Sequence, residues 1–236
     1  MRYPVKEYFD SDKMGRYAVD MTDEAPPSLR PAARPNPADA RPYHHGDLRA
    51  ALLAAAEAEL TEAGVERFSL RSVAKRAGVS HAAPAHHFGD AGGLLTALAA
   101  EGFRQFLAAQ ARREAVAASD PRAQLVAAGL GYVDFAMARP AIFRLLFGSE
   151  RPDFADPDLG HAAQAAYLHL VDQVQAAGGQ SAADEAAVWA IAHGLADLLA
   201  AGRMKGLAAF DAATRDAVIT SVIERTLPPQ DEKPGQ

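Results

Sequence analysis

The chain has 236 residues, a net charge of −6 and no cysteine. That length fits one large or two small domains, and the missing thiols exclude disulfides and thiolate metal sites. No run reaches the ~20 apolar residues of a membrane span, and the N-terminus lacks a charged segment leading into an apolar core. We therefore expect a cytoplasmic protein with no membrane partner. The alanine-rich composition, with few β-branched residues, favours helices.

The two ends of the chain differ from the rest in composition. Residues 1–42 carry seven prolines and no sustained apolar period, so we predict a disordered N-terminal extension there and a disordered tail over 229–236. Residues 41–92 hold six basic and six acidic side chains, which places the acidic excess elsewhere. The net charge is therefore no guide to what this balanced segment binds.

The segment from Tyr43 to Phe88 predicts three helices. The first runs over 47–63 with an apolar stripe and stops at Gly64. Ser69 is a good N-cap for a second helix, and Gly78 is a typical helix stop. Ser80 then reads as the N-cap of a short third helix over 81–87. Two helices joined by a turn of about three residues with a glycine have the outline of a helix-turn-helix.

The remaining chain predicts further helices and no strand. Asp90 caps a long helix to about Ala117, and Asp120-Pro121 starts the next, since proline is tolerated at the first helical position. A short apolar helix spans 140–147, and Asp156-Pro157 repeats the cap-plus-proline signal. Ser181 and Asp184 resemble a capping box for a helix to about Met204. The last helix runs from Asp211 to about Leu227. The fold class is therefore all-α, with about nine helices.

Particular stretches resemble a known family. The segments LRSVAKRAGVS and HHFGD, followed by a leucine pair, resemble the TetR family of bacterial transcriptional regulators. The stretch RPAIFRLLF, with Trp189 and His193-Gly194, resembles the TetR subgroup named for its Trp-His-Gly signature. The resemblance implies a three-helix DNA-binding domain with a helix-turn-helix over 43–90. It also implies a C-terminal helical bundle over 91–228 for effector binding and dimerisation.

The resemblance also assigns DNA contacts. A recognition helix in the major groove would read bases through serine and histidine hydrogen bonds and through alanine on thymine methyls. Two positions depart from the family pattern: Ala85 stands where tyrosine is usual, and Ala91 where lysine is common. In the family both positions normally contact phosphate. If His86 or His87 compensates for those lost contacts, DNA binding should strengthen as pH falls through the histidine range. The expected DNA-binding residues are Tyr43, His44, His45, Ser69, Arg71, Ser80, His81, Ala82, Ala83, Pro84, His86 and His87.

Aromatic residues in the C-terminal half are candidates for an effector pocket. Core packing explains such residues as well, but helical domains often bind ligands between helices. Few charged residues lie there, so the expected effector is small and apolar, and the family resemblance implies that it re-spaces the two recognition helices. The candidate residues are Phe103, Phe106, Tyr132, Phe135, Phe143, Phe147, Tyr167, Trp189 and His193.

Apolar spacing on the last two long helices predicts a dimer interface. Two helices from each subunit would form a four-helix contact, and the family resemblance implies the same mode of pairing. A two-fold dimer implies a pseudo-palindromic operator. The residues expected there are Val188, Ile191, Leu195, Leu198, Leu199, Val218 and Val222.

Other functions fit the sequence less well. Three histidine–carboxylate pairs have metal-compatible spacing, but no Glu-x-x-His motif accompanies them, and no nucleophile elbow or phosphate loop is present. We therefore expect no enzyme activity, metal site or cofactor. The main hypothesis is a ligand-responsive transcriptional repressor that acts as a homodimer. The alternative is a helical ligand-binding or interaction module that has lost specific DNA reading.

Overall fold

The computed structural model describes residues 45–227, with side chains from Leu48 onward. The predicted extension over 1–42, the tail over 229–236, and Tyr43 and His44 lie outside this range, as does the side chain of His45. Residues 51–227 belong to one compact unit. The described residues form ten α-helices, one 3₁₀-helix and no strand, which confirms the all-α class.

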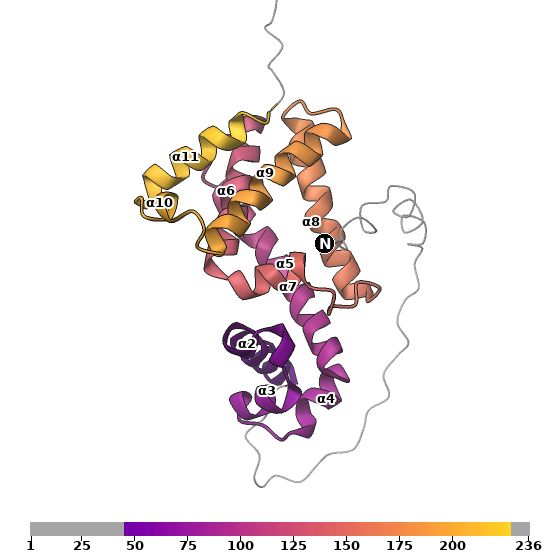
Figure 1. Ribbon diagram of the computed structural model, residues 1–236. Coiled ribbons are helices and arrows are strands. Elements are labelled where there is room, and N and C mark those ends of the chain that lie inside the picture. Colours follow the sequence, from indigo (N-terminus) through magenta and orange to yellow (C-terminus); the bar gives the residue numbers. More distant parts are fainter. Residues whose placement is uncertain (1–44, 228–236) are drawn as a thin grey trace, which may run out of the picture. The chain divides into compact units, whose positions relative to one another are not determined.

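Three helices come first, coloured indigo to magenta in Figure 1. They are α2 (His45–Ala63), α3 (Leu70–Ala77) and α4 (Ala82–Phe88), with a short 3₁₀-helix η2 (Val65–Arg67) that the sequence did not predict. Ser69 caps α3 as expected, because its hydroxyl accepts from the Ser72 N–H. Gly78 ends α3 at φ 68° and ψ 30°, a left-handed conformation that glycine adopts without steric cost.

The prediction that Ser80 caps α4 is wrong. The N-cap is His81, which lies at φ −61° and ψ −21° and makes no side-chain capping bond. His81 already has helical dihedrals, and the Ala83 N–H bonds the Ser80 carbonyl at 3.1 Å. A backbone turn therefore replaces the expected side-chain cap, and the helix begins one residue later than predicted.

The C-terminal bundle consists of α5 to α11 (Figure 1). Aspartate caps start four of its helices and the Ser181–Asp184 capping box starts a fifth, as predicted. The helix predicted to reach Met204 instead ends at Ala200, because Gly202 turns left-handed at φ 66°. The helices are α5 (Ala91–Glu114), α6 (Pro121–Ala138), α7 (Pro140–Gly148), α8 (Pro157–Ala176), α9 (Ala182–Ala200), α10 (Lys205–Ala208) and α11 (Ala212–Glu224).

Helices α5 and α6 form the centre of the bundle. Helix α5 packs against α6 and α8, while α9 and α11 pack on α6. Gly131 of α6 allows a close approach to the backbone of α5, since a Cβ there would lie 2.5 Å from the Gln110 Cα and 2.7 Å from the Ala109 carbonyl oxygen. No single described helix is long and apolar enough to cross a membrane, although α6 and α7 pass that test as a pair bent by 110°.

Candidate functional site

The surface of α4 carries the candidate base-reading residues. His81, Ala82, Ala85 and His86 are exposed, and the spacing of 81, 82, 85 and 86 places them on one helical face. Ala83 and His87 are partly buried, and Pro84 is buried. The buried ring of Pro84 is therefore part of the packing beneath α4, and the exposed face is made of histidine and alanine.

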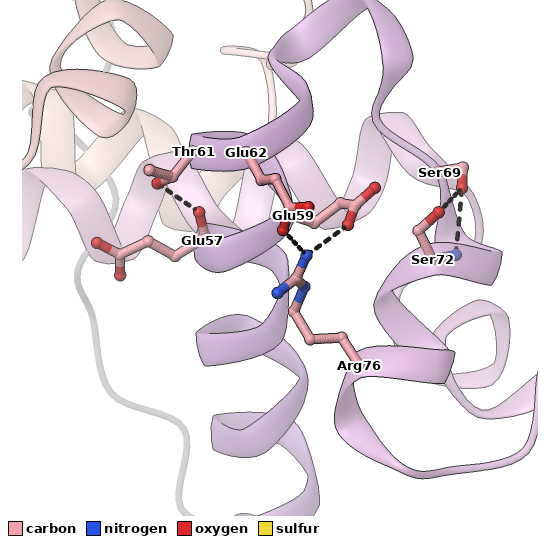
Figure 2. A network of polar contacts seen from close by, with 7 residues as sticks. All are labelled: Glu57, Glu59, Thr61, Glu62, Ser69, Ser72 and Arg76. Atoms are coloured by element: carbon pink, nitrogen blue, oxygen red, sulfur yellow. Dashed lines mark hydrogen bonds and ion pairs between the residues drawn. The ribbon is translucent and has the colours of Figure 1, made fainter.

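A charged clamp holds α3 against α2. Figure 2 shows the Arg76 guanidinium directed at two carboxylates of α2, those of Glu59 and Glu62. The Arg76 Nη2 donates to Glu59 Oε2 at 3.2 Å, and the Glu59 side chain is only 10% exposed. These hydrogen bonds raise the pKa of Arg76. Because the clamp occupies Arg76, the exposed cations Arg71 and Lys75 are better placed for an external partner.

The Ser69 hydroxyl is also occupied. It donates to the Ser72 hydroxyl at 2.9 Å and accepts from the Ser72 N–H at 3.2 Å, as Figure 2 shows. Ser80, in contrast, is exposed in the turn before α4. The cap at Ser69 thus fixes where α3 begins, and it presents Arg71 in the first turn of that helix.

Eight of the nine candidate effector residues, all except Tyr167, form one continuous set of ring contacts in the bundle, which we name the aromatic cluster. Phe106 packs edge-on against Tyr132 at 4.7 Å between ring centroids, and Phe147 lies 5.8 Å from Tyr132. The sequence did not single out Phe154, whose ring contacts Phe103 at 6.4 Å. The aromatic cluster comprises Phe103, Phe106, Tyr132, Phe135, Phe143, Phe147, Trp189 and His193.

A polar pair lies inside the aromatic cluster. The Tyr132 hydroxyl and His193 Nδ1 are hydrogen-bonded at 2.9 Å, although 61 residues separate them in the chain. Burial raises the pKa of Tyr132, partly offset by a hydrogen bond with Trp189. Burial also lowers the pKa of His193, partly offset by the charge of Asp197. Burial therefore favours the neutral form of both side chains. The remaining candidate effector residue, Tyr167, donates a hydrogen bond from its hydroxyl to Glu185 Oε2 at 3.3 Å.

The residues expected at a dimer interface divide into two groups. Val188, Leu195 and Leu199 are buried within the chain itself, because the apolar spacing of α9 also serves its packing on α6. Leu198 and Val218 are 37% and 38% exposed. Ile191 and Val222 are partly buried. The exposed members remain available to a second subunit.

No group of three or more histidine, aspartate and glutamate side chains within 45–227 is arranged to hold a metal ion. In each of the three pairs with metal-compatible spacing, one member has another partner; the pairs are Asp158/His161, His169/Asp172 and His193/Asp197. The His169 Nε2, for example, is bonded to Glu114 Oε1 at 2.8 Å, and Asp158 pairs with Arg104.

Two family models match the chain. Residues 52–98 match the model described as bacterial regulatory proteins of the tetR family, and residues 125–224 match the tetracyclin repressor-like C-terminal domain. The HTH-type transcriptional regulator BetI of Burkholderia mallei is 43% identical over 77 residues, which is 33% of this chain. That match spans only 40% of the length of the curated relative.

Solved structures match over most of the described fold. A Rhodococcus protein of unknown function is 37% identical, with a TM-score of 0.64 over 80% of this chain and 97% of its own. The fatty acid degradation regulator FadR of Bacillus halodurans has 14% identity and a TM-score of 0.60 over 80% and 98%. A TetR-like regulator from Rhodococcus has 17% identity and a TM-score of 0.57 over 76% and 95%. The last two similarities, at 14% and 17% identity, show the fold alone.

The helix-turn-helix geometry and both family models agree with one another, and so the chain belongs to the TetR family of transcriptional regulators, with that family's DNA-binding region at its N-terminal side.

Proposed function

We propose that this protein is a homodimeric, ligand-responsive repressor that binds a pseudo-palindromic operator and releases it when a small apolar effector binds. The observation that carries the proposal is the exposed face of α4, formed by His81, Ala82, Ala85 and His86, on a helix-turn-helix clamped by Arg76. Imidazoles on an exposed helix can hydrogen-bond base edges, and alanine methyls can pack on thymine. Residues 43–90 would form the DNA-binding domain and 91–228 the effector and dimerisation domain, in the cytoplasm and without a cofactor.

The DNA-contacting residues fall into two roles. We assign base reading to the exposed face of α4, and phosphate contact to the exposed Arg71, together with Tyr43, His44 and His45. Ser69 and Pro84 act indirectly, because one caps α3 and the other is buried under α4. Contacts to phosphate fix register, so loss of Arg71 should weaken binding to all sequences alike.

The aromatic cluster is the proposed effector site. Its rings come from α5, α6, α7 and α9, so a ligand that enters among them would move these helices apart. The family resemblance implies that such a movement changes the spacing of the two recognition helices. The neutral Tyr132–His193 pair supplies hydrogen-bonding atoms in otherwise apolar surroundings. Trp189 and His193 both contribute to the cluster, which supports membership of the Trp-His-Gly subgroup.

The dimer would form through α9 and α11. Leu198 and Val218 are exposed apolar side chains on these two helices, and helix pairs from two subunits can form a four-helix contact. A two-fold dimer places its recognition helices about one DNA turn apart, which is why the operator should be pseudo-palindromic.

Genome-wide recovery of DNA bound to the protein tests the proposal, followed by gel-shift on the recovered sites. A regulator should bind one palindrome with steep salt dependence, because phosphate contacts release counterions. Equally weak binding to every sequence would instead support a helical module that has lost DNA reading. The specific observation that favours this second function is the small, exposed Ala85 on the reading face of α4.

A further inference from the structure

Arg139 lies at the corner where α6 ends and α7 begins, and its main chain is bonded to both helices. Its N–H donates to the Phe135 carbonyl at 2.9 Å, and its carbonyl accepts from the Phe143 N–H at 2.9 Å. The two helices meet at 110°. Phe135 and Phe143 are both members of the aromatic cluster, so the position of Arg139 depends on how those rings pack.

The side chain of Arg139 reaches α2. Its Nη1 lies 2.8 Å from each carboxylate oxygen of Glu57 and 2.8 Å from Gln105 Oε1. Glu57 lies on the same helix as Glu59 and Glu62, which bind Arg76 of α3. Helix α2 is therefore held by a cation of the bundle at one position and by a cation of the helix-turn-helix at the next turn.

Other ion pairs of the bundle connect different elements. Arg104 pairs with Asp158, which joins α5 to α8, and Arg113 pairs with Asp134 and Asp216, which joins α5 to α6 and α11. These contacts join bundle helices to one another. The Arg139–Glu57 contact joins the bundle to the helices that precede it.

We propose that Arg139 is a positioning residue that couples the aromatic cluster to α2. A displacement of Phe135 or Phe143 moves the main chain of Arg139. The Arg139 guanidinium then either displaces the Glu57 carboxylate or loses its contact with it. Helix α2 transmits that change to α3 through Arg76. This inference rests on the proposed function, because it describes how an effector at the aromatic cluster would alter operator binding.

The absence of cysteine makes a direct measurement of helix position possible. Ala58 on α2 and Ala165 on α8 are exposed, so Ala58→Cys and Ala165→Cys can carry two spin labels on one chain. Labelled chains diluted with unlabelled ones give the distance distribution by pulsed electron paramagnetic resonance. We expect a narrow distribution in the otherwise unchanged protein and a broader or shifted one in Arg139→Gln and in Glu57→Gln. Arg113→Gln, which breaks ion pairs of α5 with α6 and α11 and touches neither labelled helix, should leave it narrow.

Operator affinity gives the second readout. Arg139→Gln and Glu57→Gln should each weaken binding to the recovered operator by about five-fold. The double variant should lose no more than either single one, since both changes break the same contact. Circular dichroism checks that each variant is folded. If one single variant does not fold, the other still tests the contact.

The outcomes separate this inference from the proposed function. Unchanged distance distributions in both single variants, or additive losses in the double variant, overturn the coupling role of Arg139. Failure of the parent protein to bind any specific DNA overturns the proposed function, while the distance measurement still decides whether Arg139 positions α2.

Discussion

The helix-turn-helix and the C-terminal bundle use different side chains to fix their structures. In α2–α4 the defining contacts are polar and close in sequence: the Ser69 hydroxyl accepts from the N–H of Ser72, three residues away, and Arg76 binds Glu59 across 17 residues. In the bundle they are aromatic and distant, as in the contact of Tyr132 with His193 across 61 residues. The first region leaves a histidine-bearing face exposed for a partner, whereas the second buries most of its aromatic rings. A partner of the first region can bind an existing surface, but a ligand of the second has to part packed rings.

The largest effect should come from changing the helix crossing inside the bundle. Gly131→Ala places a Cβ 2.5 Å from the Gln110 Cα, and backbone atoms cannot move aside as a side chain tip can. We expect the free energy of unfolding to fall by roughly 3 kcal/mol, at the upper end of overpacking costs. Urea unfolding followed by circular dichroism measures this.

Gly148→Ala is the matched control, because nothing lies within 4 Å of a Cβ at the end of α7. Its free energy of unfolding should stay within about 1 kcal/mol of the parent, with the sign favouring alanine in a helix. Equal losses in the two variants would show that helix packing at Gly131 is looser than the structure describes.

A smaller effect should follow from removing one hydroxyl in the aromatic cluster. Tyr132→Phe deletes the hydrogen bond to His193 Nδ1 and keeps the ring contacts. The expected loss is about 1 kcal/mol, the usual net value of one such bond. Tyr167→Phe removes a longer bond, of 3.3 Å to Glu185, at a less buried position, and it should change stability by less than about 0.5 kcal/mol. A Tyr132→Phe protein as stable as the parent would contradict the role given to this pair.

The polar pair should also make the bundle sensitive to acid. Burial lowers the pKa of His193 in the folded protein, so the unfolded chain binds a proton at higher pH than the folded one does. The free energy of unfolding should therefore decrease as pH falls below the ordinary histidine value of about 6.5. His193→Gln should reduce this slope between pH 7.5 and 5. Parallel curves for the two proteins would show that His193 does not contribute to it.

These differences explain how much could be predicted from sequence. Local signals identified the cap at Ser69, the left-handed Gly78 and the aspartate–proline helix starts, because each depends on neighbouring residues. The cap assigned to Ser80 failed because a backbone turn outcompeted the side chain.

Long-range features were harder to predict. The aromatic cluster was expected as a set of residues, yet the Tyr132–His193 bond could not be, since no sequence pattern reports which atoms of distant helices meet. Apolar spacing on α9 likewise could not separate Val188, which is buried in the chain, from Leu198, which is exposed. Arg139 belongs to the RPAIFRLLF stretch, but no local pattern indicates its contact with Glu57, which lies 82 residues away in the chain.

The smallest predicted effect concerns the DNA side of the comparison. Ala91 is the first residue of α5, directly after the Asp90 cap, and it stands where the family often has lysine. If this end of α5 lies against a phosphate, Ala91→Lys should add one neutralised contact and steepen the log–log salt dependence of operator binding by about 0.9. Ala108→Lys adds the same charge on the same helix, at an exposed position near its other end, and should leave the slope nearly unchanged. Gel-shift titrations at several salt concentrations compare the two. An equal slope in both variants would indicate a general charge effect, whereas a steeper slope in Ala91→Lys alone would place the start of α5 at the DNA backbone.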